Sequence, residues 1–264
     1  MSHSRPTLAV YKFSSCDGCQ LSILNLEDEL LALAEAVDIA YFLEATRAVK
    51  EGPYDLAIVE GSITTQHEIE RIKEIRQNSK KLIALGTCAT SGGIQSLRNF
   101  ADADHYANVV YEHPEYLHYL KTATPVAEHV HVDLELWGCP VNKVQVLDVI
   151  SSLLNNRQPN LPPYSVCLEC KRRNTVCVLV DQAIPCLGPV TQAGCNAICP
   201  SMGRGCYGCF GPAREVNTNS LTTILKKMER QPGETARLFR GISGYSPIFQ
   251  DAADAILEGN KVAK

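Results

Sequence analysis

The sequence lacks long hydrophobic runs and has no marked excess of charge of either sign. None of its apolar stretches approaches the roughly 18 residues of a membrane-spanning helix, and no apolar signal segment follows the opening Met-Ser-His-Ser-Arg-Pro. Lys and Arg total 25 against 29 Asp and Glu, a formal charge of -4, which gives the chain as a whole no reason to bind nucleic acid or anionic lipid. We therefore expect a cytoplasmic protein with no membrane span and no nucleic-acid partner.

Aromatic residues are also scarce, whereas cysteine is abundant. Phe, Trp and Tyr make up 6% of the 264 residues, and hydrophobic residues of all kinds make up 45%, enough for one good core and a smaller second one. The chain has 12 cysteines. Because disulfides rarely persist in a reducing compartment, their spacing is interpreted first as metal ligation.

The cysteines are unevenly distributed and indicate two domains. Four are spread over the first 166 residues, and eight crowd into residues 167–209. Between these regions the polar stretch 155–160 is followed by Pro162 and Pro163, a composition typical of a linker rather than of a continued helix. We place the domains at residues 1–158 and 159–264.

Hydrophobic periodicity in the first domain predicts alternating strands and helices. Ile69, Ile72 and Ile75 recur every three residues with charges between them, which is typical of an amphipathic helix. The expected strands are 8–13, 37–43, 54–59, 82–85 and 131–137, and the expected helices are 20–35, 68–78 and 144–154. This rhythm predicts an α/β, flavodoxin-like parallel sheet with helices on both faces. A small cysteine-rich domain with little regular structure follows, and its tail contributes only a short packing helix at 221–228.

The four dispersed cysteines each follow a predicted strand. Cys16 and Cys19 come after the first strand, Cys88 after strand 82–85, and Cys139 after the last. The carboxyl ends of parallel strands share one edge, where ligands collect, so these thiols are expected to converge. The alternative is that Cys88 and Cys139 are small core residues, as most free cysteines are. The convergence of three strand ends favours a four-thiolate site.

The other eight cysteines form two sets of four. Their spacing is Cys167-x2-Cys170-x6-Cys177-x8-Cys186, then Cys195-x3-Cys199-x6-Cys206-x2-Cys209. Four soft thiolates select zinc or an iron-sulfur cluster, and the spacing alone does not separate the two. A zinc ribbon built on the outer pairs leaves four interior cysteines unexplained. Three sets of four predict three [4Fe-4S] clusters, a chain of one-electron carriers. Since the cysteine-rich domain has few apolar residues, we expect it to fold only with its metal bound.

Five motifs, in this order, resemble the small subunit of nickel-iron hydrogenases. The resemblance covers roughly residues 7–212. The motifs are Cys16-Asp17-Gly18-Cys19, Val59-Glu60-Gly61-Ser62-Ile63, Gly86-Thr87-Cys88-Ala89-Thr90-Ser91-Gly92-Gly93-Ile94, Gly138-Cys139-Pro140 and Cys186-Leu187-Gly188-Pro189-Val190-Thr191.

The resemblance implies which cysteines hold which cluster. The proximal cluster, in the flavodoxin-like domain and nearest the nickel-iron centre of the large subunit, has as its ligands Cys16, Cys19, Cys88 and Cys139. In the iron-sulfur domain, the medial cluster is held by Cys195, Cys199, Cys206 and Cys209. The distal cluster is held by Cys167, Cys170, Cys177 and Cys186.

Two positions depart from the periplasmic members of that family. Those members have His as the first distal ligand and three medial cysteines, whereas this sequence has Cys167 and a fourth medial cysteine, Cys199. It also lacks their twin-arginine leader. These differences resemble the cytoplasmic branch, of the bidirectional NAD(P)-linked or sulfhydrogenase delta-subunit type. In that branch the partners are diaphorase subunits that carry flavin and iron-sulfur clusters.

The resemblance implies an electron-transfer subunit with no catalytic residue of its own. Nickel belongs to the obligate large subunit, so this chain conducts electrons between the nickel-iron site and the diaphorase during reversible hydrogen oxidation and is inactive alone. We expect the large-subunit interface around residues 20–26, 62–66 and 91–97. Glu60 either assists proton movement or caps a loop, and we favour the cap.

Two other functions remain open at this point. One is a zinc-binding interaction module on a flavodoxin-like domain. The other is the cluster subunit of a quinone reductase, although that family has adjacent cysteines where this chain has Cys16-x2-Cys19, and it lacks the region with eight cysteines.

Overall fold

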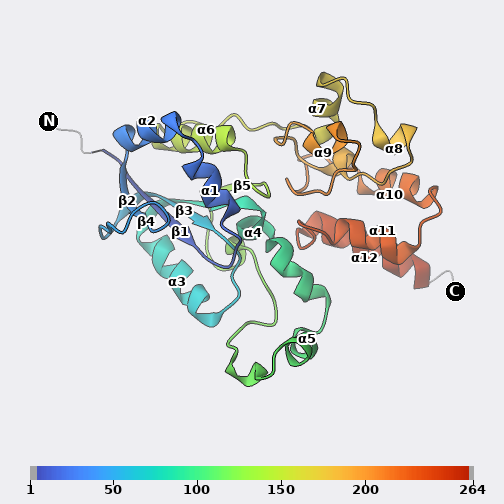
Figure 1. Cartoon of the computed structure of the whole chain (residues 1–264), viewed down its shortest axis with the longest axis horizontal. Helices are drawn as coiled ribbons and strands as arrows, with labels where there is room; N and C mark the ends of the chain where they lie inside the picture. Colours follow the sequence, from blue (N-terminus) through green and yellow to red (C-terminus); the bar gives the residue numbers. More distant parts are fainter. Residues whose placement is uncertain (1–4, 262–264) are drawn as a thin grey trace. The chain divides into compact units, whose positions relative to one another are not determined.

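The computed structural model describes residues 5–261, which form two compact units. The first ends at Asn160 and the second begins at Leu161. In Figure 1 the first unit runs from blue to green-yellow, and the second from yellow to red.

A five-stranded parallel sheet forms the centre of the first unit (Figure 1). The strands lie in the order β2-β1-β3-β4-β5. Their bounds are β1 Thr7–Lys12, β2 Asp38–Phe42, β3 Tyr54–Glu60, β4 Ser79–Leu85 and β5 Leu134–Leu136. The predicted α/β class and parallel sheet are confirmed. The last strand is shorter than the predicted 131–137, because only three of its residues pair with β4.

The register of this sheet aligns the carboxyl ends of four strands. Lys12 pairs with Glu60, Glu60 with Leu85, and Leu85 with Leu136. The loops that leave β1, β3, β4 and β5 therefore start at the same edge.

Helices cover both faces of the sheet. Figure 1 shows α3 on one side and α1, α2 and α6 on the other. A capping box between Thr65 and Glu68 starts α3, in which the Thr65 hydroxyl accepts the Glu68 N–H and the Glu68 carboxylate accepts the Thr65 N–H. The bounds are α1 Gly18–Leu24, α2 Asp28–Ala36, α3 Gln66–Gln77, α4 Gly86–Ser91, η1 Gly93–Phe100, α5 Ala103–Val110, η2 Pro114–Tyr116, η3 Val126–Glu128 and α6 Lys143–Leu154.

Two features of these helices differ from the prediction. The single helix expected at 20–35 is divided into α1 and α2, because Glu27 adopts a φ of 56°, which no right-handed helix accommodates. The segments α4, η1 and α5 were not predicted, because each has at most eight residues, too few for a helical period to be distinguished in the sequence. Across the described part of the chain, no helix combines the length and apolar character needed to cross a membrane.

The second unit has short helices in its cysteine-rich stretch and longer ones after it. The cysteine-rich stretch contains α7 Val166–Arg172, α8 Val178–Asp181, η4 Gly188–Val190 and α9 Ile198–Ser201, so the prediction of little regular structure is confirmed there. The tail forms three helices, where one short helix was expected. They are α10 Thr218–Lys226, α11 Pro232–Phe239 and α12 Pro247–Lys261.

The tail helices supply much of the hydrophobic core of the second unit. The Phe239 and Phe249 rings meet edge to face with centroids 5.9 Å apart, and both side chains are buried. The same core includes Val166 and Leu187 from the cysteine-rich stretch. The expectation that this domain has few apolar residues did not count those of the tail helices. That the unit folds only with its metal bound stays a prediction.

Removing the Phe249 ring tests this core. Phe249 is 1% exposed, and its ring lies 3.1 Å from the point where a Cβ on Gly208 would be. Phe249→Ala should lower the free energy of unfolding of the second unit by about 3–5 kcal/mol. Thermal unfolding with mass spectrometry of limited proteolysis would measure this loss and locate it. Ile248→Ala, at a 37% exposed side chain of the same helix, is the control and should have little effect. Equal melting temperatures for the two variants would contradict the assignment of this core.

Candidate metal centres

The four cysteines that were predicted to converge lie together at the carboxyl edge of the sheet. Cys16 lies in the loop after β1, Cys19 in the first turn of α1, Cys88 in α4 directly after β4, and Cys139 just after β5. Burial is the main cause that raises the pKa of the Cys88 and Cys19 thiols. Negative charge on Cys139 and Cys16 adds to the rise for Cys88, and charge on Cys88 and Cys139 adds to it for Cys19. Thiols more than 100 residues apart in sequence are therefore within electrostatic reach of one another.

Glycine at two positions leaves room beside these sulfurs. A Cβ on Gly86, which has a φ of +82°, would collide with the Cys19 sulfur. A Cβ on Gly93, with a φ of +60°, would lie 2.6 Å from the Cys88 sulfur. Both positions thus need glycine for conformation and for space. The backbone therefore approaches the Cys19 and Cys88 sulfurs closely, which a side chain at either glycine would prevent.

Partial burial of their sulfurs keeps Cys19, Cys88 and Cys139 protonated when nothing is bound to them. It raises the pKa of Cys88 to about 12 and that of Cys139 above its usual value, and the pKa of Cys19 is raised more strongly. A reactive catalytic cysteine has the opposite property, a lowered pKa. Buried thiols that neighbour one another suit metal ligation instead, in which a metal displaces the protons.

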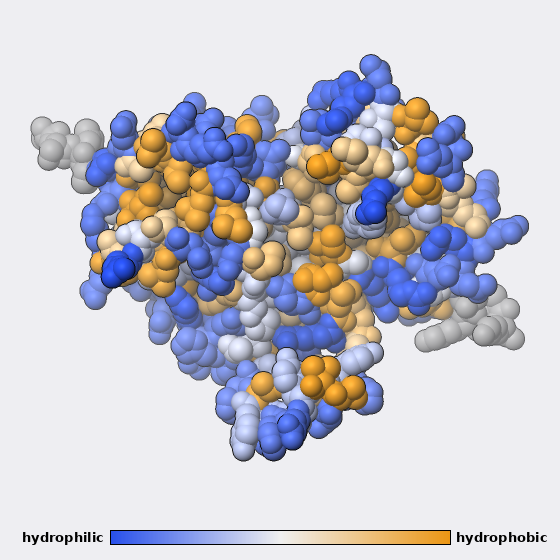
Figure 2. Space-filling view, viewed as in Figure 1, coloured by the Kyte–Doolittle hydropathy of each residue, from blue (hydrophilic) through white to orange (hydrophobic). Residues whose placement is uncertain are grey.

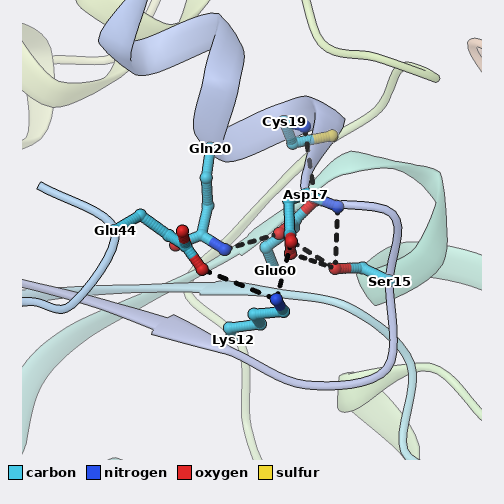
Figure 3. A network of polar contacts seen from close by, with 7 residues as sticks. All are labelled: Lys12, Ser15, Asp17, Cys19, Gln20, Glu44 and Glu60. Carbon is cyan, nitrogen blue, oxygen red and sulfur yellow. Dashed lines mark hydrogen bonds and ion pairs between the residues drawn. The ribbon is translucent and has the colours of Figure 1, made fainter.

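A buried carboxylate fixes the segment that carries two of the thiols. Glu60, at the end of β3, is 1% exposed. Its Oε2 accepts hydrogen bonds from Gln20 Nε2 at 2.9 Å and Ser15 Oγ at 3.1 Å, and its Oε1 accepts one from the Cys19 backbone N–H at 3.3 Å (Figure 3). Burial raises the pKa of Glu60, and these hydrogen bonds partly oppose that rise. The sequence singled out Glu60 but missed Gln20 and Ser15, whose only signal was that they flank the two cysteines.

Ion pairs lie at the solvent-exposed side of the hydrogen-bond network around Glu60. Lys12 Nζ lies 2.6 Å from Asp17 and 3.5 Å from Glu44, as Figure 3 shows. All three side chains are substantially exposed, so the pairs add little stability. Asp17 has a φ of 67°, and the Lys12 contact holds its side chain beside Cys16.

A second group of four thiols lines part of a cavity of about 130 Å³ in the second unit. Burial, together with charge on the other three thiols of the group, raises the pKa of Cys167 to about 11. A Cβ on Gly188 would lie 3.3 Å from the Cys186 sulfur and 3.7 Å from the Cys167 sulfur, so glycine again widens the space. The four thiols are Cys167, Cys170, Cys177 and Cys186.

The last four thiols are linked as two pairs beside that cavity. Burial is the main cause that raises the pKa of Cys195 and of Cys206, and charge on Cys199 adds to the first rise and charge on Cys209 to the second. The Cys206 backbone N–H donates to the Cys186 sulfur at 3.1 Å, and the Gly208 N–H donates to the Cys206 sulfur at 3.5 Å. The two sets of thiols in this unit are therefore direct neighbours. N–H donors also stabilise negative charge on sulfur.

The second thiol group lines a space larger than a single ion occupies. Within residues 5–261, no three or more His, Cys, Asp or Glu side chains are arranged to hold one metal ion. A tetrahedral zinc ion, with Zn–S bonds of about 2.3 Å, would draw its sulfurs to within about 4 Å of one another. The cavity among Cys167, Cys170, Cys177 and Cys186 better fits a larger group that the thiols surround.

The surface near the first thiol group differs partly from the predicted interface. Ser62, Ile63 and Thr64 are buried within the chain, so most of 62–66 is not available to a partner. Leu21 and Ile94 are exposed, as an interface requires. A further apolar surface, not predicted from the sequence, lies on α5 and is visible in orange at the bottom of Figure 2. It adjoins a cavity of about 650 Å³ whose lining includes Tyr106.

Comparison with known proteins identifies the family. The family model described as NADH ubiquinone oxidoreductase, 20 Kd subunit, matches residues 16–153. The chain is 40% identical over 221 residues to sulfhydrogenase 2 subunit delta of Pyrococcus furiosus, covering 84% of this chain and 92% of that protein. It is 30% identical over 172 residues to the delta subunit of the NAD-reducing hydrogenase HoxS of Cupriavidus necator, covering 59% of this chain and 81% of the relative.

A solved structure agrees with these relatives. A chain of an NAD+-reducing [NiFe]-hydrogenase in the H2-reduced state superimposes with a TM-score of 0.55 and 27% identity, covering 60% of this chain and 96% of that one. The Pyrococcus relative matches more of the sequence than the oxidoreductase family model does, which favours a hydrogenase over a quinone reductase. The chain therefore belongs to the small subunits of nickel-iron hydrogenases, within the wider family of the 20 Kd subunit of NADH ubiquinone oxidoreductase.

Proposed function

We propose that this chain conducts electrons through three [4Fe-4S] clusters, between the nickel-iron site of a large subunit and a flavin-containing, NAD(P)-linked diaphorase. The observation that carries the proposal is the arrangement of the cysteines as neighbouring groups, one of which lines part of a cavity. Once bound, such clusters supply reversible one-electron transfer. The chain itself supplies thiolate ligands, N–H donors to sulfur and an apolar surrounding.

Each group of thiols would hold one cluster. The proximal ligands are Cys16, Cys19, Cys88 and Cys139. The medial ligands are Cys195, Cys199, Cys206 and Cys209. The distal ligands are Cys167, Cys170, Cys177 and Cys186. The short distance between Cys206 and Cys186 supports a medial site directly beside the distal one.

The large subunit would cover the carboxyl edge of the sheet. Cys16 and Cys139 are exposed there, and so are the apolar side chains of Leu21, Ile94 and Leu97. Apolar side chains around partly exposed ligands are typical of an obligate interface. The diaphorase assignment is supported by the NAD+-reducing hydrogenase that shares this fold. Twelve free thiols support a reducing, cytoplasmic location.

Metal analysis after anaerobic purification tests the cluster count against the zinc alternative. Three [4Fe-4S] clusters correspond to about 12 irons and as many inorganic sulfides per chain. The purified protein should be brown, and zinc should be substoichiometric. Two zinc ions without iron would exclude the proposed function.

Replacing one proximal ligand tests the assignment of that group. Cys16→Ser should reduce the iron content from about 12 to about 8 per chain, because the other eight ligands lie in the second unit. Hydrogen oxidation with any acceptor should collapse, and electron paramagnetic resonance should still detect two reducible clusters. The control is Asp17→Asn, next to the ligand but without a thiol, which should keep all the iron. Near-normal activity in Cys16→Ser would place Cys16 outside the electron path.

Replacing Cys199 tests the fourth medial ligand. Cys199→Ala leaves three medial thiols, so the cluster should lose one iron and become [3Fe-4S]. Such a centre gives a resonance signal when oxidised, whereas an ordinary oxidised [4Fe-4S] centre is silent. Because cluster type and charge set the potential, the medial site should also become easier to reduce. Ser201→Ala, on the same helix α9, is the control. Unchanged iron content without a new signal would show that Cys199 is not a ligand.

A further inference from the structure

One carboxylate in the second unit joins the two neighbouring groups of thiols. Glu169 lies on α7, directly before Cys170. Its Oε1 accepts the Gly194 N–H at 2.9 Å, and its Oε2 accepts the Ala197 N–H at 3.0 Å. Gly194 and Ala197 bracket Cys195, which belongs to the other group. The helix that carries two thiols of one group is thus hydrogen-bonded to the loop that carries a thiol of the next.

The loop around Cys195 has a backbone that needs external support. Asn196 and Ala197 have φ values of 57° and 51°, and Gly194 has a φ of 143°. A residue other than glycine in the left-handed region costs about 1–2 kcal/mol, and Ala197 has no polar side chain to compensate locally. The two bonds to Glu169 satisfy N–H groups on both sides of the thiol and favour this conformation.

A second side chain from the same helix holds the same loop. Arg173, the C-cap residue of α7, donates from Nη1 to the Asn196 carbonyl at 3.1 Å. Glu169 and Arg173 are four residues apart, on one face of the helix. The carboxylate therefore binds N–H groups of the loop, and the guanidinium binds a carbonyl between them.

The charge of Glu169 acts on both groups of thiols. The Cys195 sulfur lies 3.8 Å from Glu169 Oε2. Glu169 also directly precedes Cys170 of the other group on α7, so one carboxylate neighbours a thiol of each group.

We propose that Glu169 is a positioning residue, which sets Cys195 relative to the helix of Cys167 and Cys170 and places one fixed negative charge between the two thiol groups. Its effect on potentials rests on the proposed function. A negative charge there disfavours adding an electron on either side, so it lowers the reduction potentials of both the medial and the distal site.

Three variants of the full-length protein separate the effect of the Glu169 charge from the effect of its side-chain length. Glu169→Gln removes the charge and one of the two acceptor oxygens while keeping the length. Glu169→Asp keeps the charge and shortens the side chain. Glu215→Gln removes an exposed carboxylate of the same unit and is the control for net charge.

Two measurements distinguish the contributions. In a redox titration followed by electron paramagnetic resonance, Glu169→Gln should raise the medial and distal potentials, and Glu169→Asp should restore them at least in part. In a metal-release assay with a chelator that reports iron and zinc alike, both Glu169 variants should release metal about tenfold faster than wild type, because each weakens a charge-assisted hydrogen bond. Glu215→Gln should match wild type in both measurements.

The outcomes also separate this inference from the proposed function. If wild type contains no iron, the three-cluster proposal fails, while the release assay still tests the positioning of the loop. If wild type contains about 12 irons and both Glu169 variants match it in potential and in release rate, the positioning role is wrong. Faster release with unchanged potentials would refute the proposed charge effect.

Discussion

The common carboxyl edge of the parallel sheet is the constraint on which the first thiol site depends. Lys12, Glu60, Leu85 and Leu136 lie in one register, so loops from distant parts of the sequence begin side by side. Cys16, Cys88 and Cys139 meet for that reason alone, since no short-range turn could join them. Glu60 occupies the same edge, and its buried carboxylate binds the segment from Ser15 to Gln20. The site therefore depends on strand pairing before it depends on any ligand.

The second unit reaches a comparable arrangement without a sheet. Short helices and tight turns present its eight cysteines, and contacts from elsewhere in the unit hold these turns. The Gly208 carbonyl accepts a hydrogen bond from the buried Ser243 hydroxyl at 2.7 Å, and Phe249 packs against Gly208 itself. Residues after 217, which were expected to have only a packing role, thereby support the turn between Cys206 and Cys209.

Secondary structure that depends on local sequence pattern could be predicted from the sequence. Features that depend on contacts between residues far apart in the sequence could not. The strands and the amphipathic α3 follow from periodicity, and the convergence of Cys16, Cys19, Cys88 and Cys139 follows from the rule for parallel strands. The division between α1 and α2 depends on one residue, Glu27, with a positive φ, and no composition signal marks it. The role of Glu169 depends on N–H groups about 25 residues away. Ser62 and Thr64 are buried beside two antiparallel bridges at the sheet edge, from Ser62 to Ser14 and from Ile63 to Thr124. Hydrophobic periodicity gives no indication of such isolated bridges.

The thiols of the first group lie far apart in the sequence, which limits when during synthesis the group can form. Cys16 and Cys139 come together only through a sheet whose last strand ends at Leu136, so this group is incomplete until the ribosome has passed residue 139 and the sheet has closed. The groups at 167–186 and 195–209 span short stretches, but the tail helices that pack against them are synthesised later. The side where Cys16 and Cys139 are exposed leaves this group open to solvent once the sheet has formed.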